Sequence, residues 1–208
     1  MGRIRVYTGP MFSGKTTALL SAYERATIAK KTVLAFKPKL DIRFGTDVIK
    51  SRRFGEIKAI CITDLKELKK YDADVYIIDE FQFLTGDIKI ILDLADSKDK
   101  SFYISGLDMT AERKPFGIMP ELLAIADEVQ KFVAICHDCN EENAIYSYYL
   151  GKKDIDIVLG NTEYVALCRK CMSKRLKSDK EIEKKIERSW HIFLSNYIVV
   201  SVFGRHFF

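Results

Sequence analysis

The chain has 208 residues, of which 48% are hydrophobic, and a net charge of +5. This composition suits one globular domain with a small appendage; it excludes a low-complexity or repeat protein, and no run reaches the roughly 18 apolar residues that cross a bilayer. Residues 172–208 hold eight basic and four acidic residues and so carry +4 of the charge, which leaves an almost neutral remainder and excludes a general nucleic-acid footprint there.

The first predicted element is a short buried strand at residues 4–7. The residues up to Thr8 include two arginines but lack the long apolar region of a signal peptide. We therefore expect a cytoplasmic protein that keeps its thiols reduced and has neither a membrane nor a nucleic acid as partner.

Apolar runs then alternate with helical spacings along residues 1–134. Such alternation predicts an α/β fold, an open parallel sheet flanked by helices. A plausible N-cap, Asp64, precedes the short helix that contains Leu65 and Leu68. The other predicted helices span residues 15–30 and 88–95, and the further strands span 32–36, 75–78 and 102–104.

The pattern changes after about Asp127. Val129–Ile135 is predicted to be a strand that continues into Cys136. Residues 135–172 contain paired cysteines around short aromatic-rich strands, which predicts a small zinc-ribbon-like subdomain. Residues 173–208 are expected to form a charged, solvated helical tail with an apolar C-terminus.

A phosphate-binding loop lies between the first strand and the first helix. Its residues fit the pattern GxxxxGK[ST] at every defined position: Gly9, Pro10, Met11, Phe12, Ser13, Gly14, Lys15 and Thr16. The glycines allow the backbone N–H groups to face phosphate oxygens, and the helix N-terminus adds its positive dipole end. We expect Lys15 to reach the β- and γ-phosphates of ATP and the Thr16 hydroxyl to ligate Mg²⁺.

Two carboxylates follow the predicted strand 75–78. Asp79 is suited to hold the magnesium water shell at the carboxyl edge of the sheet. Glu80 is the better candidate for a general base. These residues alone do not choose between a kinase, in which Glu80 takes a proton from a hydroxyl, and an ATPase, in which it activates water.

Four cysteines form two C-x₂-C pairs separated by 28 residues: Cys136, Cys139, Cys168 and Cys171. Two such pairs can complete a tetrahedron around Zn²⁺ and leave no position for water, so we expect a structural zinc. Two disulfides are the alternative. His137 is not needed as a ligand, and Cys61 is expected to be a buried structural thiol.

With these motifs the chain resembles the zinc-containing, type II thymidine kinases over about residues 4–171. The loop Gly9–Thr16 is similar to the family's GPMFSGK[ST] motif, and residues 36–43 are similar to its FKPxxDxR segment. Residues 78–83 resemble its IDExQF box, and residues 106–117 resemble its GLD…PFG stretch. The cysteine pairs follow in the family's order. The resemblance implies a P-loop (RecA-like) sheet with a zinc-anchored loop, the lasso, over the nucleoside.

The resemblance also implies transfer of the ATP γ-phosphoryl group to the 5′-hydroxyl of thymidine. Glu80 aligns with the family's catalytic base, Asp79 and Thr16 with magnesium-binding positions, and Asp41 and Arg43 with residues near the phosphates. The residues that it assigns to the nucleoside are Met11, Gln82, Phe83, Leu107, Phe116 and Tyr164.

The same resemblance implies a homotetramer that is inhibited by the end-product triphosphate. Phe81, Ala111 and Tyr149 differ from the residues usual in the family, and the lasso's glycine region aligns with residues 157–161 only within one residue. The acceptor base, thymine or uracil, therefore stays open. The alternative function is a zinc-bearing P-loop ATPase that acts on nucleic acid.

Overall fold

A computed structural model describes residues 2–42, 45, 47–51, 55–151 and 163–203, with side chains up to Ser189 in the last helix. The chain divides into two compact units, Met1–Cys168 and Arg169–Phe208. Arg43 and the predicted glycine region at 157–161 lie outside the described residues.

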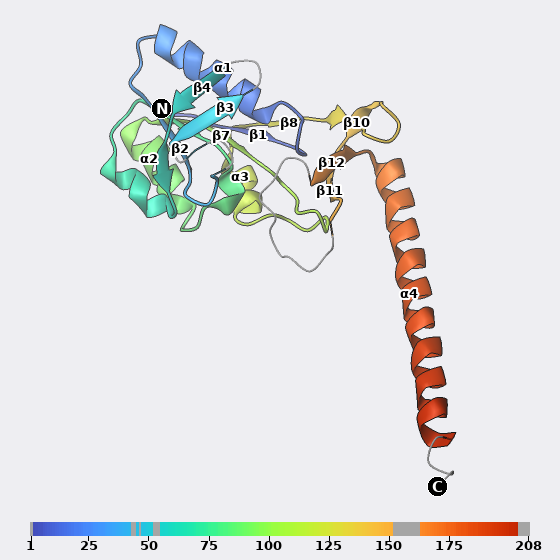
Figure 1. Ribbon diagram of the computed structural model, residues 1–208. Coiled ribbons are helices and arrows are strands. Elements are labelled where there is room, and N and C mark those ends of the chain that lie inside the picture. The colour runs from blue at the N-terminus through green and yellow to red at the C-terminus, as the bar shows by residue number, and fades with distance from the viewer. Residues whose placement is uncertain (1, 43–44, 46, 52–54, 152–162, 204–208) are drawn as a thin grey trace. The chain divides into compact units, whose positions relative to one another are not determined.

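The first unit is built on a six-stranded sheet in which every neighbouring pair is parallel (Figure 1). This confirms the predicted α/β class. The order places β7 between β6 and β1, and because the three strands are parallel, the segments that follow them leave the same edge of the sheet. Across the sheet, the strands are β5 (Ile60–Ile62), β2 (Val33–Pro38), β6 (Val75–Ile78), β7 (Ser101–Gly106), β1 (Ile4–Thr8) and β8 (Glu128–Lys131).

Helices cover both faces of the sheet because its central strands are apolar on both sides. Along β6, Val75 and Ile77 pack in one cluster with Leu19 of α1 (Lys15–Ile28). Tyr76 and Ile78 point to the opposite face, where they pack with buried residues of the remaining helices. Those helices are the 3₁₀ helix η1 (Leu65–Lys70), α2 (Lys89–Lys98) and α3 (Met119–Ile125).

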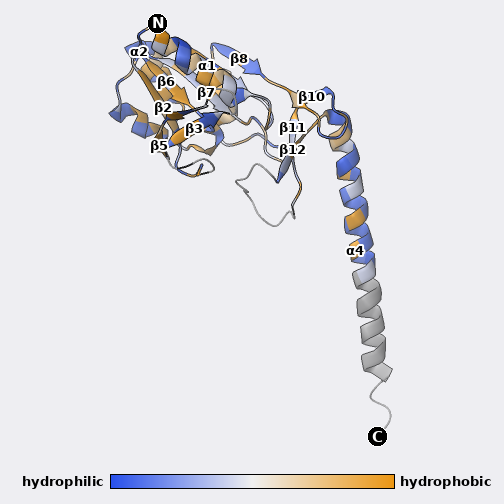
Figure 2. Cartoon of the chain, turned by 45° about the horizontal axis from the view of Figure 1, so that its top comes forward, coloured by the Kyte–Doolittle hydropathy of each residue, from blue (hydrophilic) through white to orange (hydrophobic). Residues whose placement is uncertain are grey.

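The hairpin of β3 (Val48–Ser51) and β4 (Gly55–Lys58) adds Ile49 to the α1 face. A single 3₁₀ turn, η2 (Phe81–Phe83), follows β6. Asp64 caps η1 as predicted. Its side chain accepts a hydrogen bond from the Lys66 N–H, and the Glu67 carboxylate accepts one from the Asp64 N–H. Figure 2 shows hydrophobic central strands and a hydrophilic edge strand β8.

The single strand predicted at Val129–Ile135 is wrong, because two strands occupy this segment. β8 pairs in parallel with β1 and ends at Lys131, although the Phe132 N–H still donates to the Thr8 carbonyl at 2.8 Å. The chain then joins another sheet, in which β9 (Ala134–Ile135) pairs antiparallel with β10 (Glu142–Ala144). The other antiparallel pair is β11 (Tyr146–Tyr149) with β12 (Tyr164–Leu167).

The second unit is dominated by a single helix, α4 (Arg169–Phe203), which begins four residues before the predicted tail. Its described side chains are mostly exposed, and Ile182 and Ile186 are both about half exposed. Within the part of the chain that is described, no helix combines the length and hydrophobicity that a membrane crossing requires.

Candidate active site

The loop between β1 and α1 has the backbone geometry of a phosphate cradle. Gly9 has φ +129°, and a Cβ atom there would lie 2.3 Å from the carbonyl oxygen of Phe132. Only glycine fits this position. Gly14 caps α1 in a left-handed conformation and offers no side chain to the helix end. The first N–H groups of α1 are therefore suited to bind an anion.

Two side chains of the loop hold the carbonyl oxygen of Pro10. The Lys15 ammonium donates to it at 2.6 Å, and the Ser13 hydroxyl donates to it at 2.8 Å. The loop is thus preorganised by its own side chains. On its other side, the Met11 N–H donates to the hydroxyl of Ser147 in β11 at 3.0 Å. This bond links the loop to the cysteine-containing part of the chain.

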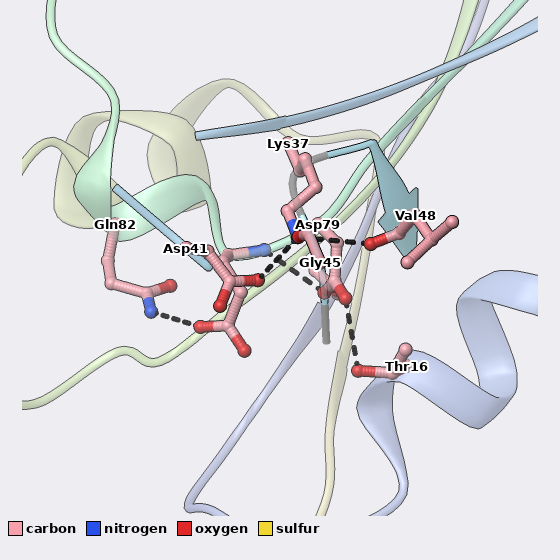
Figure 3. Close-up of polar contacts among 9 residues, drawn as sticks. Thr16, Lys37, Asp41, Gly45, Val48, Asp79 and Gln82 are labelled. Carbon is pink, nitrogen blue, oxygen red and sulfur yellow. Dashed lines mark hydrogen bonds and ion pairs between the residues drawn. The ribbon is translucent and has the colours of Figure 1, made fainter. Parts of the chain in front are cut away.

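Asp79 lies at the carboxyl end of β6 and is 7% exposed. One of its oxygens accepts from the Thr16 hydroxyl at 3.2 Å (Figure 3). The other accepts from the Glu80 N–H at 3.0 Å and from the Ser105 hydroxyl. A carboxylate and a hydroxyl beside a phosphate cradle are ligands that Mg²⁺ prefers. Sequence reasoning missed Ser105, which comes from the neighbouring strand β7.

Glu80 is held by its backbone and by its neighbour Gln82. Its φ of 52° and ψ of 40° are in the left-handed region, which is uncommon for a residue with a side chain. Its carboxylate accepts from the Gln82 amide nitrogen at 2.6 Å. The Gln82 amide oxygen accepts from the Leu107 N–H at 2.9 Å, which fixes the orientation of the amide group.

The aromatic residues assigned to the nucleoside form two groups. Phe83 and Phe116 meet edge to face, with their ring centroids 5.3 Å apart, and both are half-buried. The ring of Tyr164 in β12 lies beside that of Tyr149 in β11, with the ring centroids 5.1 Å apart. Phe81 is fully buried in the core of the sheet, so this departure from the family pattern changes the core.

Asp41 is held by a lysine that sequence reasoning did not single out. Lys37 is 1% exposed, and its ammonium lies 3.3 Å from the Asp41 carboxylate. It also donates to the carbonyls of Gly45 and Val48, at 3.2 and 3.0 Å (Figure 3). The sequence did offer a signal for this contact, a lysine inside an otherwise apolar strand. A buried ammonium requires polar partners, so such a lysine predicts a nearby carboxylate or carbonyl groups.

The four predicted zinc ligands lie together. The sulfur atoms of Cys136, Cys139, Cys168 and Cys171 are all within 4.8 Å of one another, and those of Cys139 and Cys168 are 3.9 Å apart. Tetrahedral coordination at the usual Zn–S distance needs sulfurs roughly 3.8 Å apart, so the cluster could bind zinc. Burial raises the pKa of the Cys136 thiol, but N–H groups of Cys168, Cys139 and Asp138 outweigh it and lower this pKa to about 6.

The disulfide alternative is wrong, because all five cysteines are described and none is in a disulfide. His137 is exposed and is not part of the sulfur cluster. Cys61 is only half-buried, although burial is the largest influence on its thiol and raises its pKa.

These features define an ATP-using P-loop enzyme with an attached cysteine cluster that could hold zinc. The model of the thymidine kinase family matches residues 2–172. Thymidine kinases of Mycoplasma mobile and Pseudothermotoga lettingae are 42% and 38% identical to the chain over 174 and 178 residues. These matches cover 82% and 83% of the chain and 86% and 96% of the relatives.

A thymidine kinase of Bacteroides fragilis is 37% identical over 183 residues, which cover 86% of the chain and 92% of the relative. The chain therefore belongs to the thymidine kinase family and is a kinase, that is, a phosphotransferase. The resemblance to the type II enzymes that its motifs carry is confirmed.

Proposed function

We propose that the chain transfers the γ-phosphoryl group of ATP to the 5′-hydroxyl of thymidine and releases thymidine monophosphate and ADP. The observation that carries this proposal is the position of Glu80. Its carboxylate follows the Asp79–Thr16 pair directly and is joined through Gln82 to Leu107 in the segment assigned to the nucleoside. A base in this position adjoins both reactants.

The phosphate end of the site would bind ATP through the loop Gly9–Thr16. Lys15 would exchange the Pro10 carbonyl for β- and γ-phosphate oxygens, at no cost to the fold of the loop, since Ser13 still bonds that carbonyl. Thr16 and Asp79 would hold Mg²⁺, which neutralises charge on the phosphates. Asp41 would lie near the same phosphates, together with Arg43.

In the chemical step, the 5′-oxygen of thymidine forms a bond to the γ-phosphorus as the bond to the β–γ bridging oxygen breaks. Glu80 accepts the proton of the 5′-hydroxyl, and ADP leaves with the bridging oxygen.

The nucleoside would be enclosed by Phe83, Leu107 and Phe116 on the sheet side, with Met11 from the phosphate loop and Tyr164 from β12. Residues 135–172 would act as the lasso, anchored by a structural zinc, and would exclude water when closed. We divide the chain accordingly into a catalytic part at 1–134, this lasso, and a helical tail at 173–208. We further propose a cytoplasmic homotetramer without a nucleic-acid partner.

A nucleoside panel with ATP and Mg²⁺ tests the proposed reaction. We expect thymidine to stimulate ADP formation and to yield its monophosphate, and deoxyuridine to serve as well if the pocket tolerates the missing methyl group. Deoxycytidine and deoxyguanosine should not react. The matched control is 5′-deoxythymidine, which should bind without turnover because it lacks the acceptor oxygen. ADP formation stimulated by DNA and not by thymidine would contradict the proposal and favour the ATPase alternative.

A further inference from the structure

Gln82 joins two parts of the site that sequence reasoning treated separately. Its amide nitrogen donates to the Glu80 carboxylate at 2.6 Å (Figure 3). Its amide oxygen accepts from the backbone N–H of Leu107 at 2.9 Å. The residue is 3% exposed. The sequence assigned it to the nucleoside, but both ends of its amide group are bonded within the protein.

Two glycines make room for this residue. A Cβ atom on Gly106 would lie 2.8 Å from the Gln82 side-chain oxygen. A Cβ atom on Gly117, which has φ +51°, would lie 2.4 Å from the Gln82 backbone carbonyl. Since real Cβ atoms do not approach so closely, the segment 106–117 can pack on Gln82 only with glycine at both ends. Both ends of that segment thus pack against Gln82, and Gly106 packs equally closely against the Met119 sulfur.

The backbone of Glu80 explains why such a tether is needed. Its left-handed conformation is uncommon for a residue with a side chain, and it does not by itself fix the rotamer of that side chain. A short hydrogen bond from a buried amide selects one of these rotamers. The amide cannot rotate, because its oxygen is held by Leu107.

We propose that Gln82 is a positioning residue, which holds the Glu80 carboxylate at a fixed place relative to the segment 106–117 and thereby aligns the base with the acceptor hydroxyl. This inference rests on the proposed function and deepens it. Gln82 acts through Glu80, so its loss should affect the chemical step much more than the binding of either substrate.

Steady-state kinetics of two variants tests this proposal. Gln82→Met keeps the volume and removes both hydrogen bonds, whereas Gln82→Glu keeps an acceptor for Leu107 and replaces the donor to Glu80 by a second carboxylate. We expect kcat with thymidine to fall roughly 10- to 100-fold in both, because a misplaced catalytic group costs about this much. The KM values for thymidine and ATP should change less than about threefold. Gln82→Asn, whose amide is too short, should not restore kcat.

A double-mutant cycle separates positioning from a general structural effect. Once Glu80→Gln has removed the base, Gln82→Met should lower kcat by less than about twofold further. The matched control is Gln130→Met, at an exposed glutamine in β8, which should keep full activity. If Gln82→Met does not fold, as judged by its melting temperature, Gln82→Glu carries the test.

Three results would overturn the proposal: an unchanged kcat, a raised thymidine KM at unchanged kcat, or an additive cycle. The second would return Gln82 to the role of a nucleoside-binding residue. Failure of the proposed function itself looks different, because the unmodified chain would then not phosphorylate thymidine at all.

Discussion

The α/β part of the site and the cysteine-containing part are stabilised in different ways. Around the sheet, two clusters of large apolar side chains are almost fully buried. Among the described residues of β9 to β12, the buried apolar side chains are fewer and include three alanines, Ala134, Ala144 and Ala166. Apolar burial therefore stabilises the phosphate-binding half of the site, whereas we propose that zinc bound by the sulfur cluster stabilises the cysteine-containing half.

The largest expected effect breaks the chemistry and leaves both halves folded. Glu80→Gln should lower kcat with thymidine roughly 10²- to 10⁴-fold, because the base is lost. The affinity for ATP should stay within about threefold, since the loop Gly9–Thr16 and the Asp79–Thr16 pair are untouched. Steady-state kinetics and calorimetry with a non-hydrolysable ATP analogue measure the two quantities. Glu121→Gln, at an exposed position of α3, is the control, and unimpaired turnover in Glu80→Gln would remove Glu80 from its role.

Metal removal should break one half and spare the other. Chelation, or Cys139→Ser, should lower kcat/KM for thymidine by at least about tenfold, because metal binding supplies much of the folding free energy of such small units. ATP-analogue binding and the helical circular dichroism signal should remain. Elemental analysis should find about one zinc per chain, and re-addition of zinc after chelation should restore activity.

Cys61→Ser is the matched control for the cysteine substitution, since Cys61 lies outside the sulfur cluster. It should change neither zinc content nor kcat/KM. A chain that is free of zinc yet folded and fully active would contradict the expectation that zinc stabilises the cysteine-containing part.

The sequence could predict those features that depend on neighbours in the chain. The strand–loop–helix context located the loop Gly9–Thr16, and the end of a buried strand located Asp79. The bonds from Ser105 to Asp79 and from Met11 to Ser147 join residues far apart in the chain and leave no local pattern. The break between β8 and β9 was missed because β8 ends with its pairing to β1, which is distant in sequence, whereas β9 pairs with the nearby β10.

The buried ion pair of Lys37 and Asp41 is expected to contribute to the stability of the phosphate-binding half, and a variant of Lys37 measures this contribution as a change in the free energy of unfolding. Lys37→Met removes the ammonium that faces Asp41 and the donor to two backbone carbonyls. Loss of one member of a buried ion pair costs about 3–5 kcal/mol in free energy of unfolding. Denaturant unfolding should show this loss, and the affinity for ATP should fall with it.

Lys50→Met is the control for that measurement. The Lys50 ammonium lies 3.6 Å from Glu56, and the two side chains are 50% and 56% exposed. Such a surface pair contributes about 0–1 kcal/mol, so the variant should unfold almost as the unmodified chain does. Equal effects of the two lysine variants would mean that burial at Lys37 does not stabilise the phosphate half.

The smallest expected effect concerns the bond that joins the two halves. Ser147→Ala removes the acceptor of the Met11 N–H, which lies 3.0 Å from the Ser147 hydroxyl. A hydrogen bond of this kind contributes about 1 kcal/mol, so zinc loss to a chelator should become roughly fivefold faster while ATP binding stays almost unchanged. Ser97→Ala, at an exposed site in α2, should not alter that rate. An equal rate in Ser147→Ala would mean that the zinc-held part does not depend on its contact with the loop, and that the two halves are stabilised independently.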